Sequence, residues 1–110
     1  MRLKRLLTSL VVLGASAGVA ATAGDAHAGH AVYEKSCRAC HGAEGQGNPG
    51  IAKAMNVTIH DLGSAEVQGK SDAELKKTIT EGKGKMKPVK TLSDDQAQNV
   101  IAYIRTLAKK

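Results

Sequence analysis

The apolar residues of this chain follow a helical pattern rather than the alternation of a strand. Close to the C-terminus, one apolar stripe with three- and four-residue spacing is formed by Ala97, Val100, Ile101, Ile104 and Leu107. That spacing places side chains on a single face of a helix. The stripe follows the sequence SDDQ, in which Ser93 and Gln96 make a capping box. We therefore predict a long final helix that starts at this box.

Two further helices are predicted from their start and stop signals. The sequence SDAELKKTITEG begins with a second capping box, Ser71 and Glu74, and ends at Gly82. The segment 31–40, AVYEKSCRAC, has the composition of a helix that ends at Gly42.

The remaining segments are predicted as loops because they are rich in glycine and proline. Residues 42–50 contain four glycines and one proline, and residues 82–90 contain two glycines and one proline. Residues 51–55 are long enough for one helical turn, and 56–64 show no periodicity. The fold class is therefore all-α, with three to four helices and long loops.

The N-terminal 28 residues have the pattern of a secretory signal peptide. A basic start, MRLKR, precedes an apolar stretch and then Ala-His-Ala, which predicts cleavage after Ala28; Ala-Thr-Ala makes cleavage after Ala23 the alternative. The apolar stretch is shorter than the roughly 20 residues that span a bilayer. We expect export to a bacterial periplasm and a single domain at residues 29–110.

The composition provides little material for a core. The chain has no Phe or Trp, two Tyr and 12 Gly among 110 residues. A domain this small needs an additional stabilising element, and a large apolar cofactor would supply core volume. The net charge of +6 favours an acidic protein partner over nucleic acid, because no stacking aromatics accompany the lysines.

The candidate chemistry lies in the sequence CRACH, which holds both cysteines of the chain. On a helix, Cys37, Cys40 and His41 share one face. C-x-x-C-H is the attachment signature of a c-type haem, with two thioether bonds and a histidine ligand to the iron. Three alternatives fit less well. A thioredoxin-like pair needs a preceding strand, a zinc site needs four ligands, and a disulfide here would close only a small loop.

The second axial position of the iron decides the function. Met86 is the predicted ligand, because it lies in a polar loop, GKGKMKPVK, where no apolar periodicity explains a methionine. A methionine thioether is the ligand that raises the potential of cytochromes c. Met55, His60 and His30 are the alternatives, together with an open site that would bind small ligands.

The sequence resembles the class I c-type cytochromes, small monohaem carriers of bacteria. The resemblance covers residues 29–110 and rests on GHAVYEKSCRACHG at the front and MKPVKTLSDDQAQNVIAYIRTL at the back. It implies one covalently bound haem c and crossed N- and C-terminal helices. Lys87 separates Met86 from Pro88, where many members of the family have Met-Pro directly.

The resemblance also implies roles for residues around the haem. Gly29 or Ala31 would meet Tyr103 where the terminal helices cross, and Tyr33 would pack on the haem side. The carbonyl of Pro49 would accept the Nδ1–H of the histidine ligand, with Gly50 or Asn48 as fallbacks.

The sequence thus predicts a monomeric periplasmic electron carrier rather than an enzyme. A docking patch for acidic redox partners is predicted around the ligand loop, at Lys83, Lys85, Lys87 and Lys90. Two alternatives stay open: a haem ligand-binding sensor or small peroxidase, and an electron-transfer subunit of a larger oxidoreductase.

Overall fold

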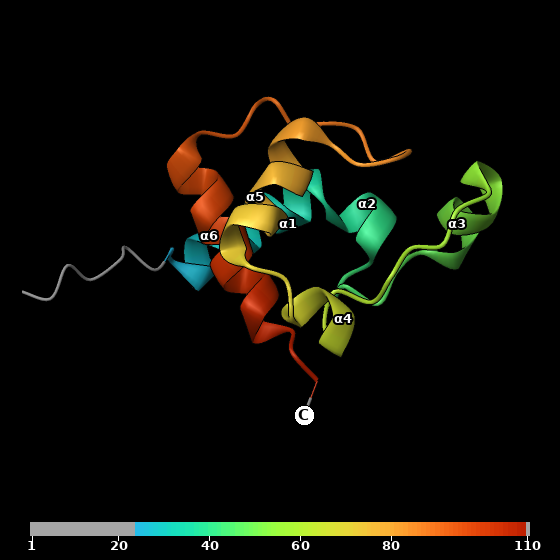
Figure 1. The fold of residues 1–110 in the computed structure, drawn as a ribbon, viewed down its shortest axis with the longest axis horizontal. Helices are drawn as coiled ribbons and strands as arrows, with labels where there is room; N and C mark the ends of the chain where they lie inside the picture. The colour runs from blue at the N-terminus through green and yellow to red at the C-terminus, as the bar shows by residue number, and fades with distance from the viewer. Residues whose placement is uncertain (1–23, 110) are drawn as a thin grey trace, which may run out of the picture.

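A computed structural model describes residues 24–109 of the chain, and this part is helical with no β-strand longer than an isolated bridge. Figure 1 shows the arrangement. In chain order the helices of the described part are α1 (Ala26–Ser36), α2 (Arg38–His41), α3 (Pro49–Met55), α4 (Ala65–Gln68), α5 (Asp72–Glu81) and α6 (Asp94–Thr106). The predicted all-α fold class is confirmed. None of the described helices is both long and apolar enough to cross a bilayer.

The centre of the fold is the crossing of α1 with α6. A Cβ atom built on Gly29 would lie 1.8 Å from the carbonyl oxygen of Asn99, so only a glycine allows this approach. Asn99 also accepts the backbone N–H of Asp25 with its side-chain oxygen, at 2.8 Å. The ring of Tyr103 stacks on His30, with 4.6 Å between ring centroids. The crossing predicted for Gly29 and Tyr103 is therefore present, and Ala31 is exposed.

The core follows from the apolar stripe of the last helix. The buried apolar side chains are Tyr33, Val67, Leu75, Ile79, Ala97, Val100, Ile101 and Ile104. Both predicted capping serines form their caps: the hydroxyl of Ser71 accepts the N–H of Glu74, and Ser93 and Gln96 bond reciprocally. The predicted helices that start at Ser71 and Ser93 are confirmed as α5 and α6, which end at Glu81 and Thr106.

The first helix differs from its prediction at both ends. It begins five residues earlier than expected, because the side chain of Asp25 accepts the N–H groups of His27 and Ala28 and so caps it. It also stops at Ser36, and a separate turn, α2, begins after Cys37. Gly42 ends this turn with a φ of 84°, as its glycine signal predicts.

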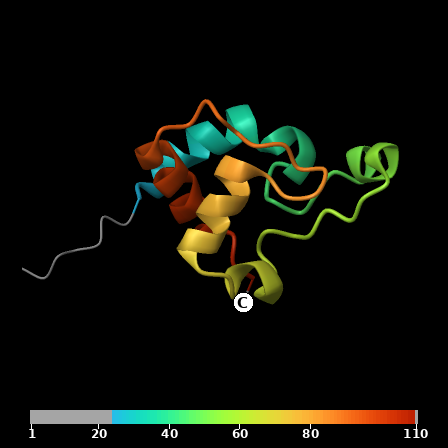
Figure 2. The ribbon, with the colours of Figure 1, turned by 45° about the horizontal axis from the view of Figure 1, so that its top comes forward.

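Two short helices extend the predicted picture. Asn48 caps α3 through its side-chain oxygen, so this helix begins at Pro49 rather than at residue 51. Figures 1 and 2 both show α3 at the far end of two neighbouring segments, away from α1 and α6. Residues 57–61 are irregular as predicted, but the following turn, α4, was not predicted; the hydroxyl of Ser64 caps it.

Candidate functional site

One large cavity, of about 910 Å³, opens between α2, α4, α5 and the loop 82–90. Figure 2 shows that loop in orange, leaving α5 and returning to α6. The volume is near the upper end of the usual range for cofactor pockets, about 300–1,000 Å³. Apolar side chains supply much of the lining, among them Val57, Ile59, Leu62, Val67, Leu75, Ile79, Val89 and Ile104. The cavity therefore suits a large, mainly apolar group.

All three residues of the C-x-x-C-H motif line this cavity. Cys37 lies between the helices and not within one, with φ −122° and ψ −33°. Its carbonyl accepts the N–H groups of Cys40 and His41, at 3.3 and 3.0 Å. These two bonds wind the motif into a turn, so the helix is interrupted and the motif still faces one space.

The Cys37 thiol lacks the lowered pKa of a reactive redox cysteine. Burial, and to a lesser extent the neighbouring Cys40, raises the pKa of the Cys37 thiol to about 11, whereas a reactive cysteine needs a lowered pKa. Both cysteines are free in this structure. Within residues 24–109, no three His, Cys, Asp or Glu side chains lie close enough to hold a metal ion. A four-ligand zinc site is therefore not assembled in the described part of the chain.

Burial favours the neutral imidazole of His41, which is the form that binds a metal. Burial lowers its pKa. Its Nδ1 atom is buried and has no hydrogen-bond partner, so the predicted bond to the carbonyl of Pro49, or of Gly50 or Asn48, is not formed. The reason is local: Asn48 uses its side chain to cap α3 and to donate to Ala39, so Pro49 begins a helix that leads away from α2.

Tyr33 lies beside the cavity rather than in its lining. The side chain is completely buried in the core, and its hydroxyl donates to the carbonyl of Gly42 at 2.6 Å. Burial raises the pKa of this phenol to about 12. In this structure Tyr33 therefore ties the turn that follows His41 to the α1–α6 crossing, and contact with a bound haem stays a prediction.

A tight turn positions Met86 at the cavity. Lys83 and Met86 exchange two backbone hydrogen bonds, of 3.0 and 2.9 Å, across a turn in which Gly84 has a φ of 57°. The N–H of Val89 donates to the carbonyl of Ile79 at 2.8 Å, which fixes the base of the loop to α5. The methionine side chain thus comes from a loop held at two points.

The alternative ligands separate into two groups. Met55 and His60 line the cavity together with Met86, whereas His30 does not. His30 is on α1, where it stacks on Tyr103 and contacts Glu34. His60 lies 3.5 Å from a carboxylate oxygen of Glu66. The geometry therefore leaves Met86, Met55 and His60 as candidates.

The four lysines of the predicted patch are exposed and all line the edge of the cavity. Lys85 differs from the others because its ammonium donates to the carbonyl of Met55. This contact joins the turn that carries Met86 to the end of α3. Within the described residues, Lys83, Lys87 and Lys90 form no ion pair, so their charges face solvent.

The donor set and the cavity fit a covalently attached haem. Two thiols and one neutral imidazole stand on one wall, a thioether comes from a separate loop, and apolar side chains surround the space between. Thioether-forming cysteines and His/Met ligation are the features of cytochrome c haem sites. Sequence reasoning missed the cavity residues of 57–62, because their irregular segment has no periodic signal.

Comparison with known proteins identifies the family. Residues 24–104 match the family model described as "Cytochrome C oxidase, cbb3-type, subunit III". The chain is 39% identical over 93 residues to "Cytochrome c-554(547)" of Halothiobacillus neapolitanus, which covers 77% of this chain and 99% of that protein. It is 36% identical to "Cytochrome c6" of Gloeothece citriformis, with 98% of each chain covered.

Another relative and two solved structures extend the comparison. The "Cbb3-type cytochrome c oxidase subunit CcoP" of Azospirillum brasilense is 33% identical, but the match covers only 28% of it and 74% of this chain. "KustC0563 c-type cytochrome" has a TM-score of 0.62 at 24% identity and covers 74% of this chain and 98% of its own. Cytochrome cL of Hyphomicrobium denitrificans has a TM-score of 0.60 at 28% identity, and the match covers 76% of this chain and 48% of that one.

Proposed function

The chain belongs to the class I c-type cytochromes, electron carriers with one covalently bound haem c, and we propose which of its residues hold that haem. Cys37 and Cys40 would form the two thioether bonds, and His41 and Met86 would be the two protein ligands of the iron. The observation that supports this assignment is that all four side chains line one apolar cavity.

Each part of the cavity has a role in electron transfer. When bound, the haem iron supplies a one-electron couple between its ferric and ferrous forms. His41 and Met86 would both hold the iron, which would leave no position for a small ligand and would let an electron pass with little rearrangement. The apolar lining keeps water away, and the thioether raises the potential. The result is a carrier with no bond-making step.

The Met86 assignment is tested by spectroscopy on the purified holoprotein. We expect the weak long-wavelength ferric band that accompanies Met–iron bonding, its loss in Met86→Ala, and its retention in Met55→Leu. His60→Gln is the corresponding control for His60, the third candidate ligand. If the band persists in Met86→Ala or is absent from the wild type, the assignment is wrong. A pyridine haemochrome spectrum establishes separately that haem is covalently attached.

We propose that Lys83, Lys85, Lys87 and Lys90, which we call the lysine rim, form the docking surface for acidic redox partners. Lys83, Lys87 and Lys90 support this role because they are exposed beside the cavity and carry no ion pair within the described residues. Exposed charges of this kind act mainly on association rates and on their salt dependence.

A small anionic oxidant tests the rim without a known partner. Oxidation of the reduced protein by ferricyanide should slow as salt is added, and the slope should be shallower in the double variant Lys83→Gln/Lys87→Gln. Lys35→Gln is the control, because it removes one charge from α1 at a lysine that does not line the cavity. Equal slopes in the wild type and the double variant would contradict the docking role.

Export to the periplasm is proposed with cleavage after Ala23. The sequence predicts a signal peptide of residues 1–28, with cleavage after Ala28 and Ala23 as the alternative site; residues 1–23 lie outside the described part. Cleavage after Ala28 would remove the Asp25 cap, the bond from Asp25 to Asn99 and the helical turn before Gly29. The intact mass of the exported holoprotein distinguishes the two sites, and a mature chain that starts at Gly29 would contradict this proposal.

A role as an electron-transfer subunit of a larger oxidoreductase is the second candidate. The family description and the partial match to the CcoP subunit favour it. The independent carrier is better supported, because the c-554(547) and c6 relatives are matched over 96–99% of their length. Co-purification of the exported protein with a membrane oxidase would favour the subunit role.

A further inference from the structure

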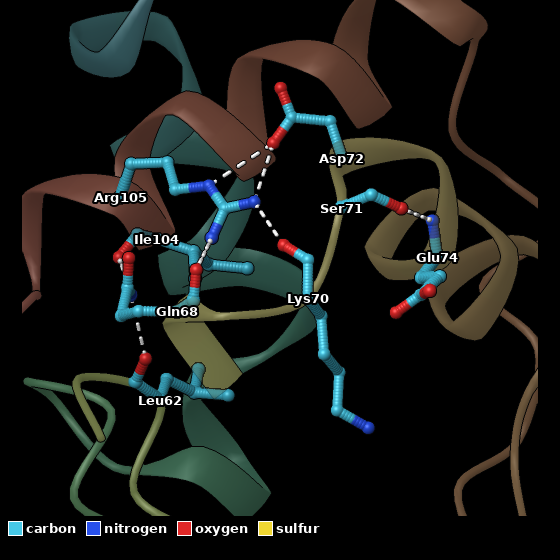
Figure 3. A network of polar contacts seen from close by, with 8 residues as sticks. All are labelled: Leu62, Gln68, Lys70, Ser71, Asp72, Glu74, Ile104 and Arg105. Carbon is cyan, nitrogen blue, oxygen red and sulfur yellow. Dashed lines mark hydrogen bonds and ion pairs between the residues drawn. The ribbon is translucent and has the colours of Figure 1, made fainter. Parts of the chain in front are cut away.

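Arg105 forms a network of hydrogen bonds outside the cavity. It lies in the last turn of α6, and its guanidinium faces the connection between α4 and α5 (Figure 3). One terminal nitrogen donates to the carbonyl of Gln68 at 2.8 Å and the other to the carbonyl of Lys70 at 2.6 Å. Two nitrogens also contact one carboxylate oxygen of Asp72, at 2.7 and 3.1 Å.

The side chain of Gln68 completes the network. Its amide nitrogen donates to the carbonyl of Leu62 at 2.8 Å and to the carbonyl of Ile104 at 2.9 Å (Figure 3). The segment 62–72 is therefore tied to the last turn of α6 at Gln68, Lys70 and Asp72, and Gln68 in turn holds Leu62 at the start of the segment. We call Arg105 and Gln68, with these backbone bonds, the α6 clasp.

The segment that the clasp holds is one wall of the cavity. Leu62, Glu66, Val67 and Lys70 line the cavity, and so does Ile104, the residue before Arg105. Arg105, Gln68 and Asp72 are not in the lining. These three side chains would not touch a group bound in the cavity, so the packing effect of the clasp on such a group passes through the position of this wall.

The bonds from Arg105 to the two backbone carbonyls contribute more to holding the segment 62–72 than its ion pair with Asp72 does. The side chain of Asp72 is 73% exposed, whereas that of Arg105 is 30% exposed. An exposed ion pair contributes little to stability. The bonds to the backbone are charge-assisted, and the carbonyl of Gln68 ends α4, where no partner within the helix remains for it. A planar guanidinium can serve both carbonyls at once, and an ammonium cannot match that geometry.

We propose that Arg105 and Gln68 are positioning residues for the haem site: they hold the wall 62–72 against the cavity, exclude water and thereby raise the reduction potential. This inference rests on the proposed haem site. Solvent exposure is one of the factors that set the potential of a haem, and added water favours the more highly charged ferric state.

The test compares reduction potentials of holoproteins below their unfolding transitions. Arg105→Gln and Gln68→Met should each lower the potential, so that at a fixed applied potential the ratio of reduced to oxidised protein falls by up to about tenfold, or about 59 mV for one electron. Arg105→Lys should shift it in the same direction. Asp72→Ala should leave it unchanged, because both carbonyl bonds remain.

A matched control separates positioning from stability. Lys76 pairs with Asp94 at 3.1 Å and also joins α5 to α6, but neither residue lines the cavity. Lys76→Gln should therefore leave the potential unchanged. If both clasp variants unfold more readily with unaltered potentials, or if Lys76→Gln shifts the potential equally, the proposal is overturned. If Arg105→Gln yields no holoprotein, the reduction potential of Gln68→Met decides the question. A wild type that carries no haem would refute the proposed function instead.

Discussion

The two halves of this molecule obtain their packing in different ways. At the α1–α6 crossing, the backbones of the two helices are in direct contact, with no room for a Cβ on Gly29. The side chains of Tyr33 and Val100 are fully buried there. On the other side, α2, α4 and the loop 82–90 surround a cavity of about 910 Å³. The first half is a protein core, and the second is a lining for the haem c of the family.

This difference explains how a chain without Phe or Trp folds. The crossing needs few large side chains because a glycine brings the helices close together. The apolar residues of the other half line the cavity, where a bound haem would contribute core volume. Mutations at the crossing should therefore act on stability, and mutations at the cavity should act on the haem.

The largest expected effect is the loss of both thioether bonds. The double variant Cys37→Ser/Cys40→Ser should retain no covalent haem, because these are the cysteines of the C-x-x-C-H motif and both line the cavity. Haem staining after denaturing electrophoresis measures this. Ser36→Ala, at a neighbouring position that also lines the cavity, should keep its haem. Covalent haem in the double variant would contradict the attachment sites.

The next largest effect should come from Gly29→Ala at the crossing. The new methyl group would overlap the carbonyl of Asn99, at 1.8 Å, and would force the helices apart. Overpacking of this kind costs about 1–3 kcal/mol, measured as a lower urea midpoint of the holoprotein. Gly50→Ala in α3 is the matched control, because its Cβ would meet only the side-chain oxygen of Asn48 at 3.4 Å. An unchanged midpoint for Gly29→Ala would contradict the tight crossing.

The two halves also differed in how well the sequence predicted them. The helices at 71–82 and 93–106 were predicted because their caps and apolar spacing are local signals. The start of α1 was missed, since its cap, Asp25, lies inside the segment assigned to the signal peptide. The break at Cys37 has no sequence signal, because the residues on both sides favour helix.

The site was predicted as residue types and not as contacts. Cys37, Cys40, His41 and Met86 were predicted from a motif and from an unexplained methionine, and all four line the cavity. The bond from His41 to Pro49 is not formed in this structure, because a carbonyl acceptor depends on the path of a glycine-rich loop. The clasp of Arg105 spans 37 residues to Gln68, and no local pattern encodes such a contact.

A smaller effect is expected where the two halves are joined. Tyr33→Phe removes the hydrogen bond to the carbonyl of Gly42, which costs about 1 kcal/mol and should lower the urea midpoint. The haem spectrum should not change, because Tyr33 does not line the cavity. Tyr103→Phe is the control, since its hydroxyl makes no hydrogen bond within the described residues. An altered haem spectrum in Tyr33→Phe would instead support the predicted contact with haem.

The smallest effect concerns a surface contact between α1 and α2. Glu34 accepts a hydrogen bond from Arg38 at 2.5 Å and contacts His30 at 3.2 Å; the bond from Arg38 is the main reason that the pKa of Glu34 is lowered from 4.5. A lowered folded-state pKa stabilises the protein above the unfolded value, and this contribution is lost as the pH falls through the folded value.

Glu34→Gln should therefore lower the urea midpoint slightly at neutral pH, and the difference from wild type should vanish in acid, below the lowered pKa. The carboxylate is exposed, so salt should also reduce the difference. Glu44→Gln, at an exposed acid without an ion pair in the described residues, should show no such pH dependence. A difference that grows in acid would have the wrong sign for this contact. Equal midpoints for Glu34→Gln and wild type at every pH would mean that the junction of the two halves depends on backbone bonds such as that from Cys37 to Tyr33, and not on charge.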